Sequence, residues 1–418
     1  MSSATVARPR PGPRRGRIRI GRFSINLRDR DTVVYLCLAI GALAFPTVAD
    51  FITGGEGGPI VLLAADAGVY VLLALGLNVV VGFAGLLDLG YAAFFAIGAY
   101  TYALMASGSL GHTPLHHAIH IPFWFLLLVG VVIAATAGAL LGAPTLRLRG
   151  DYLAIVTLGF GEIVPRVFRN AGDWTGGVNG LSALDNPVIP YWISGPWSDP
   201  GSPVMVIKNL VFSVANPTAW YVLMLALVTL SVVMLNNLRK SRLGRAWMAI
   251  REDETAAQAM GINTVTTKLL AFAMGAATSG FAGCFYGAKL SLVSPENFQF
   301  QVSITILVMI VLGGMGSMPG VIVGALTIYL VLFKILPDAP NQVHSLLATT
   351  GFTGIDQPHG DWPGLGELVS RLKFLLFGLI LVTTMLLRPG GLIPSRAEID
   401  VERAAKESAT LHQEGAQG

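Results

Sequence analysis

Three carboxylates lie within or beside long apolar stretches of this chain, where charged groups could do chemistry. They are Asp66, Asp88 and Glu162. Charged side chains are costly inside a membrane and often mark a polar path, and a chain of carboxylates could also relay protons. Asp88 could instead cap a helix. Lys268 and Lys289 sit near the ends of apolar runs, so we interpret them as anchors that reach water with their long side chains.

Patterns for catalysis, metal binding and nucleotide binding are weak. One histidine cluster exists, formed by His112, His116, His117 and His120, and no neighbouring carboxylate or cysteine accompanies it. Cys37 and Cys284 lie in apolar runs and provide neither a disulfide framework nor a cysteine metal site. The sequence lacks a phosphate-binding loop and contains no Gly-Lys dipeptide. We therefore predict no catalytic residue, metal or bound cofactor, and any ATP must be hydrolysed by another chain.

The composition places these residues in a membrane protein. Of 418 residues, 53% are apolar and 12% are charged, about half of the ~25% charged residues that soluble domains carry. The mean hydropathy is +0.64. These values exclude a soluble enzyme for most of the chain, and a net charge of +4 is too weak to indicate nucleic-acid binding.

Apolar runs long enough to span a bilayer recur along the chain, and a membrane helix needs about 20 such residues. We predict spans near 33–52, 60–80, 86–106, 122–144, 152–168, 217–237, 267–292, 300–313, 317–336 and 372–388. The segments 152–168 and 300–313 are short, which is typical of discontinuous or re-entrant helices beside a transport path. The predicted fold is an all-α polytopic bundle of about ten transmembrane helices, or eight if both are re-entrant.

Glycines recur at helical spacing in several of these spans. Gly316, Gly320 and Gly324 follow one another every fourth residue, and similar pairs occur at 283/287 and 138/142. Because glycine lets helix backbones approach closely in lipid, these positions predict tight packing and say little about substrate.

Basic residues orient the bundle, since short cytoplasmic segments carry an excess of Lys and Arg. Nine arginines crowd the first thirty positions, and more follow in the loops near 147 and 239–251. We predict a basic cytoplasmic arm over 1–32, a permease domain over 33–388 and a cytoplasmic tail over 389–418. Both termini would then face the cytoplasm, with the bundle in the plasma membrane.

The loop 236–272 is long and carries an amphipathic helix. Trp247, Ile250, Ala257 and Met260 recur at helical spacing, and Gly261 is a natural stop. A helix lying in the headgroup layer usually carries Lys and Arg on its polar face, whereas acidic residues 252–254 share this one. The pattern favours docking of a partner protein.

The segment Thr255-Ala-Ala-Gln-Ala-Met-Gly261 resembles the E-A-A-x-x-x-G coupling sequence of ABC importer permeases, with Thr255 in the glutamate position and Glu254 just before it. The resemblance implies that helix 243–261 sits in a groove of an ATPase subunit and passes nucleotide-driven closure to the spans. The coupling residues it implies are Trp247, Arg251, Glu254, Ala256, Ala257 and Gly261.

Four further segments, at 76–104, 146–163, 174–182 and 311–325, look like the branched-chain amino acid permease family of LivM type. The resemblance spans about 75–335. It implies a bacterial inner-membrane importer with a sister permease of LivH type, two ATPases that hold ATP-Mg, and an extracytoplasmic binding protein. Urea or short amides as substrates, and an ion-coupled secondary transporter, remain alternatives.

A neutral amino acid would need backbone N–H groups for its carboxylate, an acceptor for its ammonium group and an apolar wall. Gly176 and Gly177 beside Asn179 supply permissive backbone at the end of a span. The candidate path residues are Asp66, Asp88, Tyr91, Phe94, Phe95, Glu162, Gly176, Gly177 and Asn179.

Overall fold

The computed structural model describes residues 17–20, 23–26, 30–108, 119–145, 151–182, 184–187, 212 and 216–350, with isolated positions within 372–394. The first 16 residues, His112, His116 and His117, most of the expected last span and the tail from residue 395 lie outside the described residues.

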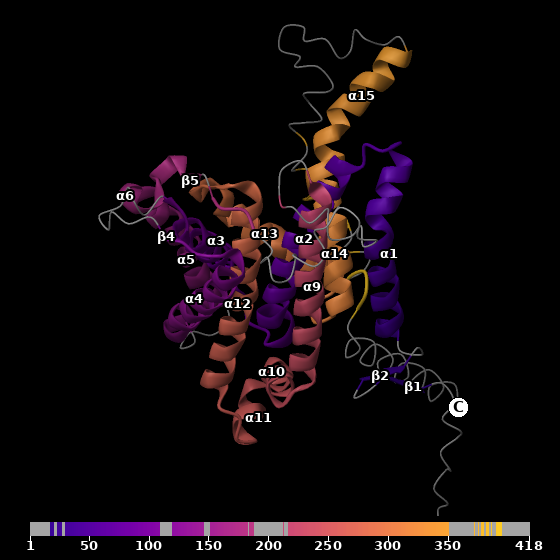
Figure 1. The fold of residues 1–418 in the computed structure, drawn as a ribbon. Coiled ribbons are helices and arrows are strands. Elements are labelled where there is room, and N and C mark those ends of the chain that lie inside the picture. Colours follow the sequence, from indigo (N-terminus) through magenta and orange to yellow (C-terminus); the bar gives the residue numbers. More distant parts are fainter. Residues whose placement is uncertain are drawn as a thin grey trace, which may run out of the picture.

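The described chain is almost entirely helical, as the apolar runs predict (Figure 1). Its long helices are α1 (Arg30–Ile52), α2 (Gly58–Asn78), α3 (Ala92–Met105), α4 (Phe123–Thr145), α5 (Asp151–Asn170), α9 (Pro217–Lys240), α10 (Arg242–Glu252), α12 (Thr264–Leu290), α13 (Phe300–Gly313), α14 (Met318–Leu330) and α15 (Leu336–Thr350). π-Helical turns η1 (Val79–Phe83) and η6 (Val331–Ile335) extend α2 and α14 without a break.

Short elements complete the fold. They are the helical turns α6 (Gly172–Thr175), η3 (Gly177–Asn179), α11 (Glu254–Ala259) and η5 (Pro295–Phe298), and the antiparallel strand pairs β1 (Arg17–Ile20) with β2 (Phe23–Asn26), β3 (Ala106–Ser107) with β4 (Ile119–His120), and β5 (Leu181–Ser182) with β6 (Leu292–Val293). We call the end of the bundle that carries α10 and α11 the α10 end, and the opposite end, which carries α6, β5 and α15, the α15 end (Figure 1).

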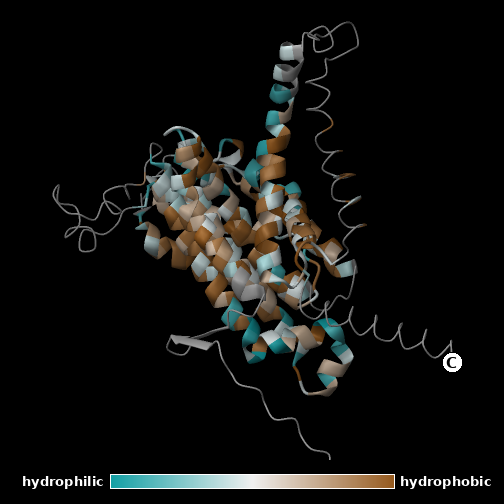
Figure 2. Cartoon of the chain, turned by 90° about the vertical axis from the view of Figure 1, so that its right-hand side faces the viewer, coloured by the Kyte–Doolittle hydropathy of each residue, from teal (hydrophilic) through white to brown (hydrophobic). Residues whose placement is uncertain are grey.

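Seven helical segments of the described residues are long and apolar enough to cross a membrane, which confirms a polytopic helical membrane fold. Hydrophobic residues dominate the middle of the bundle, whereas hydrophilic residues gather towards α10 and α11 (Figure 2). The expected span 86–106 is wrong in its first part, because the helix begins only at Ala92. Gly85, with φ of 69°, ends the preceding helical run, and residues 84–91 are largely non-helical.

Helix α12 is the centre of the bundle and packs most extensively against α4, α3 and α2. The glycine spacing predicted such close approach, and the structure confirms it. A Cβ atom added to Gly98 of α3 would lie 2.6 Å from the Cα of Gly280 on α12, and one on Gly138 of α4 would lie 2.5 Å from the Cβ of Ala276. The helix backbones therefore touch where no side chain intervenes.

We expect Gly98→Ala to destabilise the protein, because the added methyl group must push α3 away from α12. Overpacking of this kind costs about 1–3 kcal/mol, measured as a lower unfolding temperature of the purified transporter in detergent. Gly159→Ala is the matched control, since nothing lies within 4 Å of its added Cβ and alanine favours helix by up to about 1 kcal/mol. Equal effects of the two substitutions would contradict this packing.

Candidate functional site

The loop at the α10 end folds into two short helices rather than the single helix predicted over 243–261. Helix α10 is amphipathic, and its apolar face buries Trp247 completely. The indole Nε1 of Trp247 donates a hydrogen bond to the carbonyl of Thr267 at 2.6 Å. Since Thr267 lies in the first turn of α12, this contact fixes α10 to the central helix of the bundle.

The break between the two helices falls at Asp253. Its backbone is extended (φ −153°, ψ 109°), and its Oδ1 accepts hydrogen bonds from the backbone N–H groups of Thr255 and Ala256 at 2.8 and 3.0 Å. An N-cap of this kind satisfies donors that a new helix would otherwise leave unpaired. The acidic cluster thus contains a helix start, which hydrophobic spacing alone does not reveal.

A partly buried ion pair joins α11 to α12. The Lys268 ammonium lies 2.6 Å from Oε1 of Glu254, and its side chain is only 7% exposed. The interpretation of Lys268 as an anchor that reaches water is therefore wrong, because Glu254 compensates the charge inside the protein. Ala257 is buried beside these residues, whereas Thr255, Ala256, Met260 and Gly261 are exposed. The outer face of α11 is held rigidly and left open.

A second buried ion pair lies deeper in the bundle. The Lys289 ammonium of α12 binds the Asp66 carboxylate of α2 and also donates to the carbonyl of Leu62 at 3.2 Å. The Lys289 side chain is 5% exposed, so its interpretation as a snorkelling anchor is also wrong. The pair ties α2 to α12 toward the α15 end and places a carboxylate and an ammonium side by side inside the bundle.

The start of α3 is buried in the middle of the protein. Oδ1 of Asp88 accepts from the backbone N–H of Gly90 at 2.9 Å, and the N–H of Ala92 donates to Oγ of Ser303 at 2.9 Å. Asp88 is 1% exposed, and its Oδ2 has no partner among the described residues. The hydrogen bond from Gly90 to Oδ1 agrees with the interpretation of Asp88 as a helix cap. The other carboxylate oxygen, Oδ2, leaves an acceptor free at a buried helix start.

The aromatic path candidates lie in packed surroundings. The Tyr91 hydroxyl donates to the carbonyl of Gly275 at 2.8 Å, and the rings of Phe95 and Phe298 meet edge to face at 5.0 Å. Phe94 is buried next to the Tyr91 ring. Tyr91 and Phe95 thus hold the start of α3 against α12 and η5.

Comparison with known proteins identifies the family of this chain. Residues 60–349 match the family described as the permease component of the branched-chain amino acid transport system. The chain belongs to this family. Its relatives are permease subunits of transporters and not enzymes. Together with the seven apolar helices, this family makes the chain a multi-pass membrane protein. No solved structure gives a significant match.

Named relatives agree with the family. The high-affinity branched-chain amino acid transport system permease protein LivM of Escherichia coli K12 is 37% identical over 355 residues, covering 81% of this chain and 71% of the relative. LivM of Salmonella typhimurium is 44% identical over 261 residues, and the match spans 62% of this chain and 59% of that protein. LivH of Escherichia coli K12 is 26% identical, with 62% and 78% covered.

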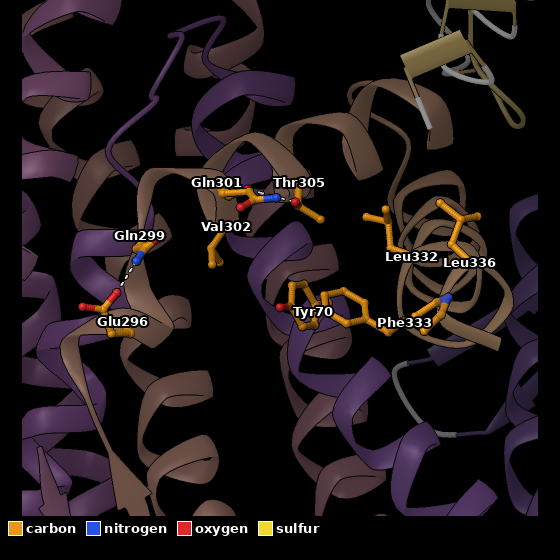
Figure 3. A pocket seen from close by; sticks show the side chains of 10 residues that line it. Tyr70, Glu296, Gln299, Gln301, Val302, Thr305, Leu332, Phe333 and Leu336 are labelled. Atoms are coloured by element: carbon orange, nitrogen blue, oxygen red, sulfur yellow. Dashed lines mark hydrogen bonds between the residues drawn. The ribbon is translucent and has the colours of Figure 1, made fainter. Parts of the chain in front are cut away.

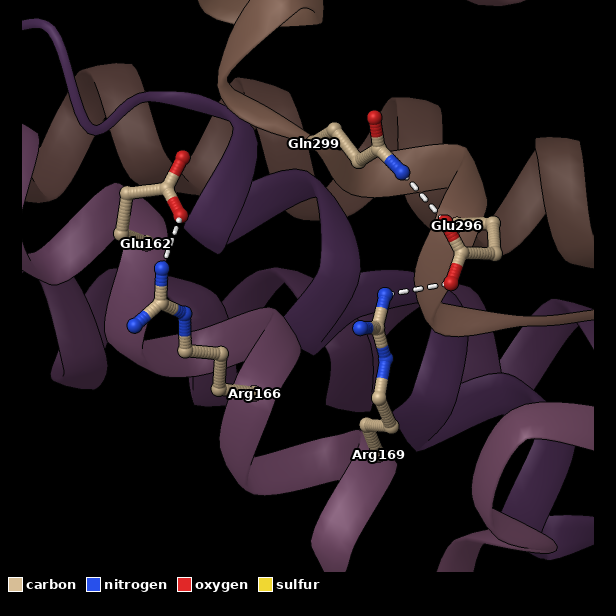
Figure 4. A network of polar contacts seen from close by, with 5 residues as sticks. All are labelled: Glu162, Arg166, Arg169, Glu296 and Gln299. Carbon is tan, nitrogen blue, oxygen red and sulfur yellow. Dashed lines mark hydrogen bonds and ion pairs between the residues drawn. The ribbon is translucent and has the colours of Figure 1, made fainter.

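The remaining path candidates of the permease lie at the α15 end, in or near an ionic network (Figure 4). Glu162 pairs with Arg166 one turn further along α5 at 3.2 Å, and both side chains are exposed. Arg169 binds Glu296 of η5, which also accepts from Gln299. The contact between Arg169 and Glu296 joins residues 127 positions apart in the chain, so spacing in the sequence gave no signal for it.

Gly176, Gly177 and Asn179 form the tight loop that follows α5. Gly176 and Gly177 have φ of 71° and 59°, a conformation that favours glycine. A Cβ added to Gly177 would lie 3.3 Å from the carbonyl of Arg169. The loop therefore packs on the end of α5 beside the network, and Asn179 is exposed.

A cavity of about 350 Å³ opens toward the α15 end and was not predicted (Figure 3). Amides and a hydroxyl line one side, and aromatic and aliphatic side chains line the other. Its lining residues are Tyr70, Glu296, Gln299, Gln301, Val302, Thr305, Leu332, Phe333, Leu336 and Pro337. Because α2, η5, α13, η6 and α15 each contribute, only the tertiary fold brings these residues together.

The described residues contain no group of three or more potential metal ligands. Of the histidine cluster, the structure describes His120, whose Nδ1 lies 2.6 Å from Oδ2 of Asp185. The expectation that no carboxylate accompanies the histidines is wrong for this residue, because β4 and the stretch after β5 come together through tertiary packing.

We expect Lys289→Met to destabilise the permease by about 3–5 kcal/mol, since it leaves the Asp66 carboxylate partly buried without a partner. The double substitution Asp66→Asn with Lys289→Met should recover most of this loss, because no uncompensated charge remains. Thermal unfolding of the purified transporter measures both. Arg166→Ala, which breaks an exposed pair, is the control and should cost less than about 1 kcal/mol. No recovery in the double variant would contradict the pairing.

Proposed function

We propose that this chain is one of two unlike permease subunits of an ATP-driven importer of branched-chain amino acids. The observation that carries the proposal is the family match over residues 60–349 together with relatives named as branched-chain amino acid transport permeases. Matches to both LivM and LivH proteins support pairing with a sister permease of LivH type.

The geometry of the α10 end supports docking of an ATPase there. Helix α11 presents Thr255 and Ala256 outward, the turn that follows presents Met260 and Gly261, and Met260 is 83% exposed. The Trp247 hydrogen bond and the Glu254–Lys268 ion pair hold this face against α12. A rigid, exposed apolar tip is a surface on which a partner can push, and flexible methionine side chains suit such contacts. Ala257 would complete the coupling segment from the buried side, and Arg251 would complete it through its contact with Gly82.

Two ATPases and an extracytoplasmic binding protein complete the proposed assembly. ATP-Mg would bind to the ATPases, since this sequence has no phosphate-binding loop. The excess of basic residues in the arm and near α10 supports a cytoplasmic α10 end in a bacterial inner membrane. Both termini, including the arm 1–32 and the tail 389–418, would then face the cytoplasm, and the α15 end would meet the binding protein.

We place the substrate path along the inner helices of the permease domain, 33–388. Asp66 and Asp88 offer carboxylates. Tyr91, Phe94 and Phe95 lie at the start of α3. Glu162, Gly176, Gly177 and Asn179 lie toward the entrance at the α15 end. A path supplied by a binding protein needs only weak selectivity.

Met260→Asp should weaken association with the ATPase subunits by about tenfold or more, because an interface anchor contributes about 2 kcal/mol or more. Co-purification of the ATPases with the tagged permease, followed by titration of purified ATPase, measures this effect. Trp174→Asp is the matched control: it places the same charge on an exposed hydrophobic residue of α6, at the opposite end. Normal ATPase binding by Met260→Asp would contradict the docking proposal.

A further inference from the structure

The long helix formed by α2 and η1 ends at a carbonyl group that another element caps. The last carbonyls of a helix have no partner within the helix. Here the Arg251 side chain, from the last turn of α10, donates from Nη1 to the carbonyl of Gly82 at 2.5 Å. The Arg239 guanidinium of α9 lies 5.9 Å from the ring centre of the adjacent Phe83. Two cations from the α10 end thus stabilise the negative end of this helix.

The Arg251 guanidinium also lies against the turn between α13 and α14. The backbone N–H of Gly316 donates to Oδ1 of Asn78 at 2.9 Å, which ties this turn to the end of α2. A Cβ added to Gly316 would lie 3.0 Å from Nη1 of Arg251, and one added to Gly85 would lie 2.9 Å from its Cγ. Both glycines have positive φ, 81° and 69°. The arginine therefore occupies a slot that glycine backbone leaves open.

The chain that follows this junction leads directly to the buried start of α3. After Phe83 it runs through residues 84–91, where the N–H of Leu89 donates to Oγ1 of Thr157 at 3.1 Å and Asp88 is buried. Helix α3 then begins at Ala92. A displacement of the Gly82 carbonyl would reach the α3 start through the nine residues 83–91.

We infer that Arg251 is the positioning residue that passes movement of α10 and α11 to the end of α2–η1, to the Gly316 turn and so to the start of α3. The inference rests on the proposed function, because it presumes that an ATPase moves α11. Hydrogen bonds from a charged donor are short and strong, and the planar guanidinium has several donors with fixed directions. Arg251 can therefore hold the Gly82 carbonyl while contacting the Gly316 turn.

Arg245 provides a contrast on the same helix. Its Nη1 donates to the carbonyl of Lys240 at 2.9 Å, an exposed contact at the junction of α9 and α10. Arg245 and Arg251 thus share charge, size and helix, but only Arg251 reaches the bundle. Comparing Arg245→Ala with Arg251→Ala therefore distinguishes the effect of losing a positive charge at the α10 end from the effect of losing the contact with Gly82.

The test uses the complete transporter in liposomes, with branched-chain amino acid uptake and ATP hydrolysis measured on the same preparation. We expect Arg251→Ala to lower the number of solute molecules imported per ATP hydrolysed by about tenfold or more, since the variant loses a hydrogen bond from a charged donor. Arg251→Lys should fall between Arg251→Ala and the wild type, because lysine keeps one charged donor. Arg245→Ala should leave the ratio unchanged.

A second measurement keeps the inference testable if Arg251→Ala assembles poorly with the ATPases. A spin-label or fluorophore pair on α3 and α12 should report a nucleotide-dependent distance change in the wild type, and Arg251→Lys should reduce it while still binding the ATPases. A wild-type ratio in Arg251→Ala, or an equal loss in Arg245→Ala, would overturn the inference alone. Absence of ATP-dependent uptake by the wild-type transporter would instead overturn the proposed function.

Discussion

Close backbone contact around α12 is the constraint on which the rest of this structure depends. A bundle in lipid gains little from burying apolar side chains, so its helices are held by fit and by hydrogen bonds. Glycines on α3, α4 and α12 remove the side chains where these helices cross, at Gly98 and Gly280 above all. The Cys284 thiol occupies the same region, within 3.4 Å of the Gly98 carbonyl and 3.6 Å of the Leu126 carbonyl.

Because α12 is fixed in this way, it can carry an ionic contact near each end. Lys268 binds Glu254 at the α10 end, and Lys289 binds Asp66 toward the α15 end. Each lysine is nearly buried and each pair joins α12 to a different element, α11 or α2. The central helix therefore connects the exposed face of α11 to the interior of the bundle.

The sequence predicted the parts of this arrangement that depend on local pattern. Apolar runs located the helices, glycine spacing located their contacts, and the helical spacing of Trp247 and Ala257 located the amphipathic segment at the α10 end. Features that depend on tertiary partners were missed. The break at Asp253 comes from a side-chain cap, and the ion pairs of Lys268 and Lys289 need carboxylates from other helices. The cavity beside Tyr70 is assembled from five elements. The path candidates and coupling residues stay predictions.

The most direct measurement of the central claim is uptake of radiolabelled leucine into liposomes that contain this chain alone or together with its sister permease, ATPases and binding protein. The account predicts accumulation only in the complete assembly and only with ATP-Mg on the side of the ATPases. Accumulation by the isolated chain under a proton or sodium gradient, without any nucleotide, would contradict it.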